Sequence, residues 1–161
     1  MNVNRSVLFL LVCAIVIAAA PVLRAETPAE QAKMCGGIPL TTDLLDKMDA
    51  FVKAMNSDAA AKAELVEIGK DPGVGQTPES WVSAINSKCP KSAANLKTAG
   101  ISVDDFAKGM FALMGCSMSE DLAKSEDATV KVNYEFVKAN NDRATKTFSE
   151  FMQLSMPPDT K

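Results

Sequence analysis

Apolar residues recur every three or four positions along most of residues 41–156, which is the spacing of amphipathic helices. The stretch TTDLLDKMDAFVKAMN, for example, places Leu44 and Met48 on one face, behind Thr41 or Thr42 as the N-cap. No run of alternating β-branched residues bounded by turns occurs. The sequence therefore predicts an all-α fold, a single compact bundle of about five or six helices over residues 41–156.

Caps, prolines and glycines mark where these helices begin and end. After the first helix, the expected starts are near Ser57, Pro78, Pro90, Ser102 and Asn133. Gly100 has the place of a left-handed helix stop, and the last helix ends before Pro157. Asn140 and Asn141 are poor helix formers, so they could kink or divide that last helix.

The first 25 residues have the pattern of an export signal. Arg5 precedes an uninterrupted apolar run of fourteen residues from Val7 to Ala20, which is shorter than the roughly 20 residues that span a bilayer. We expect cleavage after Ala25, with retention of the segment as an anchor as the alternative. Residues 26–40, rich in Gly and Pro, are expected to form a loose lead-in, and residues 157–161 a disordered tail.

Three cysteines, Cys35, Cys89 and Cys116, follow the expected cleavage site. Disulfides persist in exported proteins, so we expect one structural bridge and one thiol left over. The helices that carry Cys89 and Cys116 fold back at Gly100, and their depths from that turn differ by several ångströms. The pairing of those two is therefore less favourable, which favours Cys35 in the bridge with either partner.

Removal of residues 1–25 would take away Arg5 and Arg24 and no acid, leaving 15 basic and 20 acidic residues and a net charge of −5. An acidic chain without a basic block repels phosphate backbones. We therefore expect no nucleic-acid partner and no insertion into a membrane after signal cleavage.

The chain contains no histidine, the commonest general base and metal ligand. It also lacks C-x-x-C, G-x-S-x-G, S-x-x-K and P-loop motifs. The carboxylate pairs Asp104/Asp105 and Glu126/Asp127 stand at a helix start and in a polar loop, where each has a structural explanation. These observations predict a protein that is not an enzyme and binds no cofactor.

The stretch MFALMGCSM contains soft sulfur ligands and so raises the question of a metal site. On a helix, Met114 and Met118 lie about 40° and 80° from Met110, among core residues, whereas Cys116 lies near −120°. The thiol therefore cannot converge with those two methionines. We expect flexible core packing for the methionines and no metal site.

Two segments carry a family resemblance: CPKSAANLKTAGISVDDFAKGMFALM and VNYEFVKANNDRATKTFSEFM. Over residues 89–151 the chain resembles a group of small exported helical proteins of Gram-negative bacteria. The resemblance implies an all-α fold in the bacterial envelope, and it brings no catalytic residues with it.

Two functions remain open from the sequence. The first is a periplasmic or secreted helical module that binds a protein partner or acts structurally in the envelope. The alternative is a carrier of an apolar small molecule in a pocket between helices, lined by Phe106, Met110, Phe111 and Met114.

Overall fold

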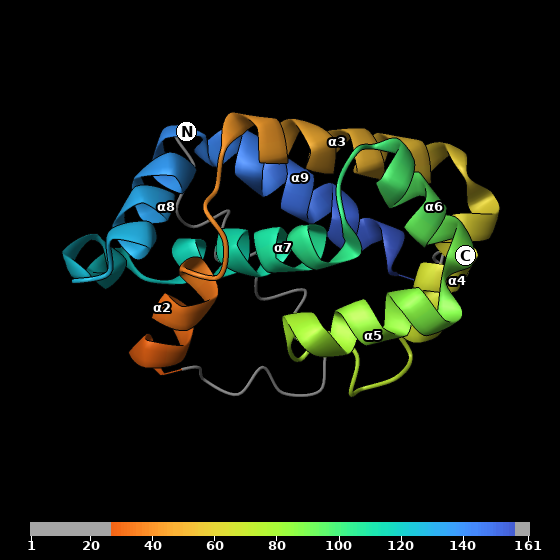
Figure 1. Ribbon diagram of the computed structural model, residues 1–161, viewed down its shortest axis with the longest axis horizontal. Coiled ribbons are helices and arrows are strands. Elements are labelled where there is room, and N and C mark those ends of the chain that lie inside the picture. The colour runs from red at the N-terminus through yellow and green to blue at the C-terminus, as the bar shows by residue number, and fades with distance from the viewer. Residues whose placement is uncertain (1–26, 157–161) are drawn as a thin grey trace, which may run out of the picture.

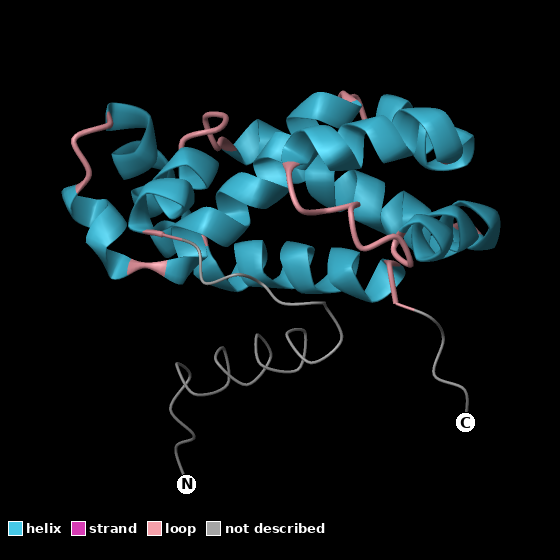
Figure 2. Ribbon diagram, turned by 90° about the horizontal axis from the view of Figure 1, so that it is seen from below, coloured by secondary structure: helices cyan, strands magenta, loops and turns pink. Residues whose placement is uncertain are grey.

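A computed structural model describes residues 27–156, and within that range the chain is all-α. These residues form eight α-helices, one 3-10 helix and no strand. Figures 1 and 2 show how the helices are arranged. The predicted fold class is therefore confirmed for this part of the chain, although the helices outnumber the expected five or six. The expected signal segment 1–25 and the tail 157–161 lie outside the described residues.

The helices follow one another with short connections. They are α2 (Pro28–Cys35), α3 (Thr42–Ser57), α4 (Ala59–Ile68), α5 (Pro78–Lys88), α6 (Pro90–Thr98), α7 (Val103–Met118), η1 (Glu120–Lys124), α8 (Ala128–Ala139) and α9 (Asn141–Leu154). Thr41, Thr77 and Ser102 cap α3, α5 and α7 by accepting hydrogen bonds from backbone N–H groups. Gly100 adopts φ +74°, the predicted left-handed stop after α6.

Two of the predicted caps are wrong. Asp58, and not Ser57, caps α4 by accepting from the N–H groups of Ala60 and Ala61. The helix expected to start at Asn133 begins five residues earlier, because Asp127 accepts from the first turn of α8. A carboxylate at the N-cap also offsets the positive end of the helix dipole, which favours these starts.

The segment 26–40, expected as a loose lead-in, contains helix α2. Thr27 and Glu30 form a capping box at its start, and Pro28 occupies the first helical turn. An isolated helix of eight residues is marginal in water, so α2 depends on what it packs against. Helix α2 is thus one helix more than the sequence predicted. Another arises because the last helix is divided at Asn140 into α8 and α9, a division that the sequence allowed.

Helix α7 runs through the middle of the molecule, with α3 and α9 on one side and α2 and α5 on the other (Figure 1). The centre of the core is an aromatic cluster of Phe51, Trp81, Phe106 and Phe151, one ring from each of α3, α5, α7 and α9. Neighbouring ring centroids lie between 4.6 and 5.8 Å apart, mostly edge to face.

A polar link joins α9 to α3 outside this cluster. Arg143 donates from Nε to Asp49 at 2.8 Å and from Nη2 to Asp46 at 2.5 Å. The hydroxyl of Thr147, one turn further along α9, donates to the other oxygen of Asp49. This network orients the two long helices α3 and α9 relative to each other.

Candidate functional site

A buried disulfide between Cys35 and Cys116 joins α2 to α7, with the two Cα atoms 4.9 Å apart. The expected single bridge is thus present, with Cys35 in it, and Cys116 is the partner that the sequence left open. Cys89 is the free cysteine of the described residues and is also buried. A cross-link over 81 residues holds the short helix α2 against the centre of the bundle.

Gly115, next to the disulfide, permits this close crossing of helices. A Cβ atom at Gly115 would lie 2.8 Å from the backbone nitrogen of Cys35 and 2.8 Å from the Cβ of Met34. Such distances are shorter than van der Waals contact, so any larger residue would push the two helices apart. The Cβ atom of Met34 therefore lies directly against α7 at Gly115.

Asn133 in α8 holds the segment that leaves α2. Its side chain is fully buried, donates to the carbonyl oxygens of Cys35 at 2.5 Å and Ile38 at 2.7 Å, and accepts from the N–H of Leu40 at 2.7 Å. An irregular segment has no helix partners for these backbone groups, so a buried amide is suited to satisfy them. This role replaces the predicted N-cap role of Asn133.

Three carboxylates of the two predicted pairs have structural roles, and Asp127 has one that the sequence did not predict. Asp104 accepts from the ammonium group of Lys108 at 2.6 Å, and this hydrogen bond raises the pKa of Lys108. Asp105 pairs with the cap Ser102, whose hydroxyl donates to it at 2.7 Å. Asp127 is the N-cap of α8. These three carboxylates are engaged in caps or an ion pair at the surface.

Cys89 stands at the N-cap of α6, where a thiol is usually activated by the helix dipole. Here Glu64 of α4 occupies that place by accepting from the N–H groups of Lys91 at 3.1 Å and Ser92 at 3.0 Å. Burial, and then the charge of Glu64, raise the pKa of the Cys89 thiol to about 11. The thiol is therefore protonated at neutral pH and is a poor nucleophile.

The four residues proposed from the sequence to line an apolar pocket divide into two groups. Phe106 and Met110 are buried, and the ring of Phe106 packs among the other aromatic rings of the core. Phe111 and Met114 are half-buried at the surface. A pocket lined by all four stays a prediction.

The expectation that Met110, Met114 and Met118 all pack in the core is wrong. Met110 is buried, but Met114 is half-buried and Met118 is 44% exposed. Helical spacing indicates which residues share a face, but it does not show whether another helix covers that face. The side of α7 near Met118 is only partly covered.

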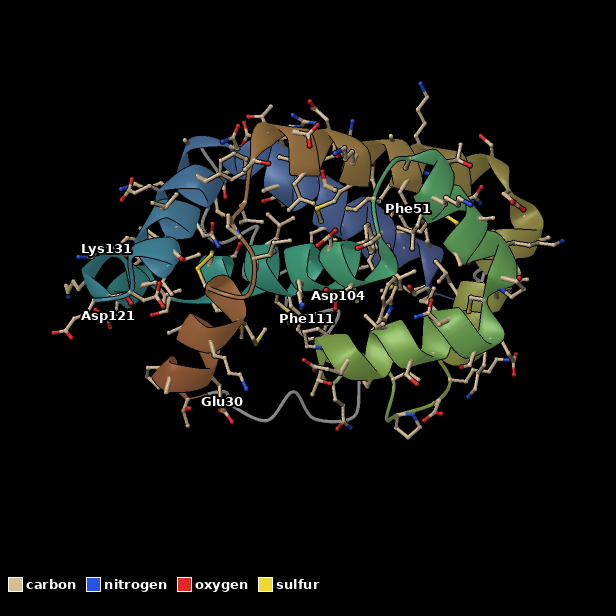
Figure 3. All side chains as sticks on the ribbon, viewed as in Figure 1. Glu30, Phe51, Asp104, Phe111, Asp121 and Lys131 are labelled. Carbon is tan, nitrogen blue, oxygen red and sulfur yellow. A yellow bond between two sulfur atoms is a disulfide. The ribbon has the colours of Figure 1, made fainter. Side chains whose placement is uncertain are left out.

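Phe111, Met114 and Met118 lie within about 60° of one another around α7. Met34 of α2 adjoins them at Gly115, and it is also half-buried. Figure 3 shows Phe111 on the side of α7 that lies between α2 and α5. We call Met34, Phe111, Met114 and Met118 the methionine strip. Sequence reasoning missed Met34, because no local pattern predicts where α2 crosses α7.

Two observations concern the described residues as a whole. Their Cys, Asp and Glu side chains form no group of three or more that could hold a metal ion. None of the helices between residues 27 and 156 is both long and apolar enough to cross a membrane.

Comparison with protein-family models, curated proteins and solved structures gives no match. The resemblance over residues 89–151 therefore stays a prediction.

Proposed function

We propose that this protein is a non-enzymatic exported helical module that binds a protein partner through the methionine strip. The observation that carries this proposal is the partial exposure of large apolar side chains on one face of α7, next to a rigid cross-linked helix. Grouped apolar side chains at a surface are a mark of interaction sites. Methionine suits such a site because its flexible, polarisable side chain adapts to the shape of a partner.

The chemistry of the polar groups supports a non-enzymatic role. Asp104, Asp105 and Asp127 are engaged in an ion pair and in caps, and the thiol of Cys89 is kept protonated. General acid–base and nucleophilic catalysis need a titratable group whose pKa is matched to the working pH and which can reach a substrate. The chain also has no histidine to supply such a group.

The placement of Phe106 favours a protein partner over the alternative of an apolar small molecule held between helices. Its ring centroid lies 4.6 Å from that of Phe51 and 5.2 Å from that of Phe151. These contacts fill the space in which a ligand lined by Phe106 would have to bind. The residues of the proposed pocket that remain accessible, Phe111 and Met114, belong to the methionine strip. An open strip at the surface is better suited to contact a protein than to enclose a small molecule.

Export into an oxidising compartment, either the periplasm or the medium, is part of this proposal. The buried Cys35–Cys116 bridge is compatible with it, because disulfides persist in such compartments. The resemblance of residues 89–151 to small exported helical proteins of Gram-negative bacteria agrees with the same location.

Site-specific photo-cross-linking tests the proposal in producing cells. A photoreactive phenylalanine analogue in place of Phe111 is expected to give a discrete adduct with another protein. The same analogue in place of Lys146, an exposed residue of α9, is expected to give none. Equal adducts from the two positions, or none from position 111, would count against binding through the strip. Turnover of a substrate by the purified protein would contradict the non-enzymatic role.

A further inference from the structure

Three methionines lie near the point where α2 crosses α7. Met114 and Met118 are four residues apart on one helix, a spacing that places their Cβ atoms about 5–6 Å from each other on the same face. Met34 comes from α2, with its Cβ 2.8 Å from the position of a Cβ at Gly115. Each side chain has three rotatable bonds beyond Cα, so all three sulfur atoms can turn toward a point above this part of α7.

The backbone that presents these side chains is held in place. The Cys35–Cys116 disulfide lies one residue from Met34 and two from both Met114 and Met118. Asn133 fixes the carbonyl oxygens of Cys35 and Ile38 just beyond Met34. The backbone on both sides of this crossing is therefore anchored before any ligand binds, which lowers the ordering cost of binding.

The partial exposure of these methionines leaves the sulfurs open to solutes. Met118 is 44% exposed, and Met34 and Met114 are half-buried. Thioethers are neutral, soft ligands that select monovalent copper over harder cations such as zinc or magnesium. Silver(I), which has the same charge and similar softness, is the redox-inert probe of this chemistry.

We propose that Met34, Met114 and Met118 bind one soft monovalent cation, Cu(I) or Ag(I), through their three sulfur atoms. This site differs from the one rejected from the sequence, because Met34 of α2 takes the place of Cys116, whose sulfur is committed to the disulfide. The proposal therefore replaces the expectation of no metal site. Binding of the cation goes beyond the proposed binding of a protein, because it depends on the sulfur atoms and not on the apolar surface. The methionine strip can therefore bind both a cation and a protein, and a substitution can remove one activity without the other.

The first test is titration of the purified, oxidised protein with Ag(I), followed by native mass spectrometry and by NMR of the methionine methyl groups. We expect one bound ion and shifted methyl signals for Met34, Met114 and Met118. The signals of the buried Met48 and Met55, on α3, are expected to stay in place. A parallel titration with Cu(I), kept reduced by ascorbate in the absence of thiols, is expected to shift the same three signals.

Leucine variants separate the thioethers from the apolar surface. Met34→Leu, Met114→Leu and Met118→Leu keep the size and apolarity of the side chains, and each is expected to raise the dissociation constant for Ag(I) by about tenfold or more. Met156→Leu, at a 38% exposed methionine after α9, is the matched control and should leave affinity unchanged. Cys89→Ser, which removes the free thiol, should leave it unchanged as well.

The absence of a bound ion, or binding that survives the triple leucine variant, would overturn the inference. So would shifts confined to other methionines. Cross-linking from position 111 in the triple leucine variant distinguishes this failure from failure of the proposed function. Adducts that persist while Ag(I) binding is lost show that the strip binds protein and metal by separate means.

Discussion

The side-chain amide of Asn133 donates a 2.5 Å hydrogen bond to the main-chain carbonyl of Cys35, across 98 positions of sequence. The same side chain also serves Ile38 and Leu40. One buried residue of α8 therefore fixes the exit of α2 at the point where the disulfide fixes its last turn. The surface proposed to bind a partner depends on these two attachments.

Replacement of Asn133 by alanine removes three hydrogen bonds and leaves buried backbone groups without partners. We expect the free energy of unfolding to fall by about 3 kcal/mol, since each buried unsatisfied group costs about 1–3 kcal/mol. Urea denaturation measures this change. Asn86→Ala, at an exposed position of α5, is the control and should stay within about 0.5 kcal/mol of wild type. Equal effects of the two substitutions would contradict the anchoring role of Asn133.

The disulfide is expected to stabilise the whole domain and α2 in particular. Closure of a loop of 81 residues corresponds to about 4 kcal/mol in the chain-entropy model. Cys35→Ser with Cys116→Ser should lower stability by about that amount and should speed trypsin cleavage after Lys33, an exposed residue of α2. Cys89→Ser should leave cleavage unchanged. If cleavage after Lys33 is as slow without the bridge as with it, α2 is held by other contacts.

Two glycines of α7 provide a matched comparison of close packing. Gly115→Ala places a Cβ 2.8 Å from the backbone of Cys35, which cannot move aside while the disulfide holds it, so we expect a loss of about 1–3 kcal/mol. Gly109→Ala meets only side-chain atoms, with the flexible sulfur of Met48 at 3.1 Å and Leu44 Cδ2 at 3.5 Å. Alanine also favours a helix over glycine by about 1 kcal/mol, so Gly109→Ala should be near neutral. Thermal unfolding of the two variants measures this difference. A lower unfolding temperature for Gly109→Ala than for Gly115→Ala would contradict the close packing at Gly115.

Much of the helical architecture could be predicted from local signals. Thr41, one of the two cap candidates of α3, and Ser102 are N-caps in the structure, and α5 begins at the predicted Pro78. Such starts can be predicted because a cap bonds to residues two or three positions away. Gly100 is likewise a stop set by its own backbone angle. The division of the last helix at Asn140 follows from the low helix propensity of asparagine.

The missed features depend on contacts between distant segments. Helix α2 is only eight residues long and is held by a disulfide to residue 116, whereas the glycines and prolines around it predict a loose segment over residues 26–40. Asn133 resembled a cap, but its partners lie more than 90 positions away. The periodicity of α7 placed Met114 and Met118 on one face correctly, yet it could not show that the surrounding helices leave that face partly open.

The raised pKa of Cys89 predicts a specific dependence of stability on pH. The thiol has a folded pKa of about 11, above its ordinary value of 9.0, so the folded state retains its proton longer than the unfolded state. The resulting stabilisation is present below about pH 9 and is lost as the pH rises toward about 11. We expect wild type to lose about 2 kcal/mol more than Cys89→Ser over that interval, measured by urea denaturation. Parallel curves for the two proteins would show that the thiol is not buried in this way.

The central claim is that the methionine strip is a protein-binding surface. Its most direct test is the dissociation constant of the partner captured from position 111, measured for wild type, Met118→Asp and Met156→Asp. A charge at the centre of an apolar contact should weaken binding about 30-fold or more, whereas Met156→Asp, at an exposed position after α9 and outside the methionine strip, should not. Equal dissociation constants for all three proteins, each shown to be folded, would contradict the account.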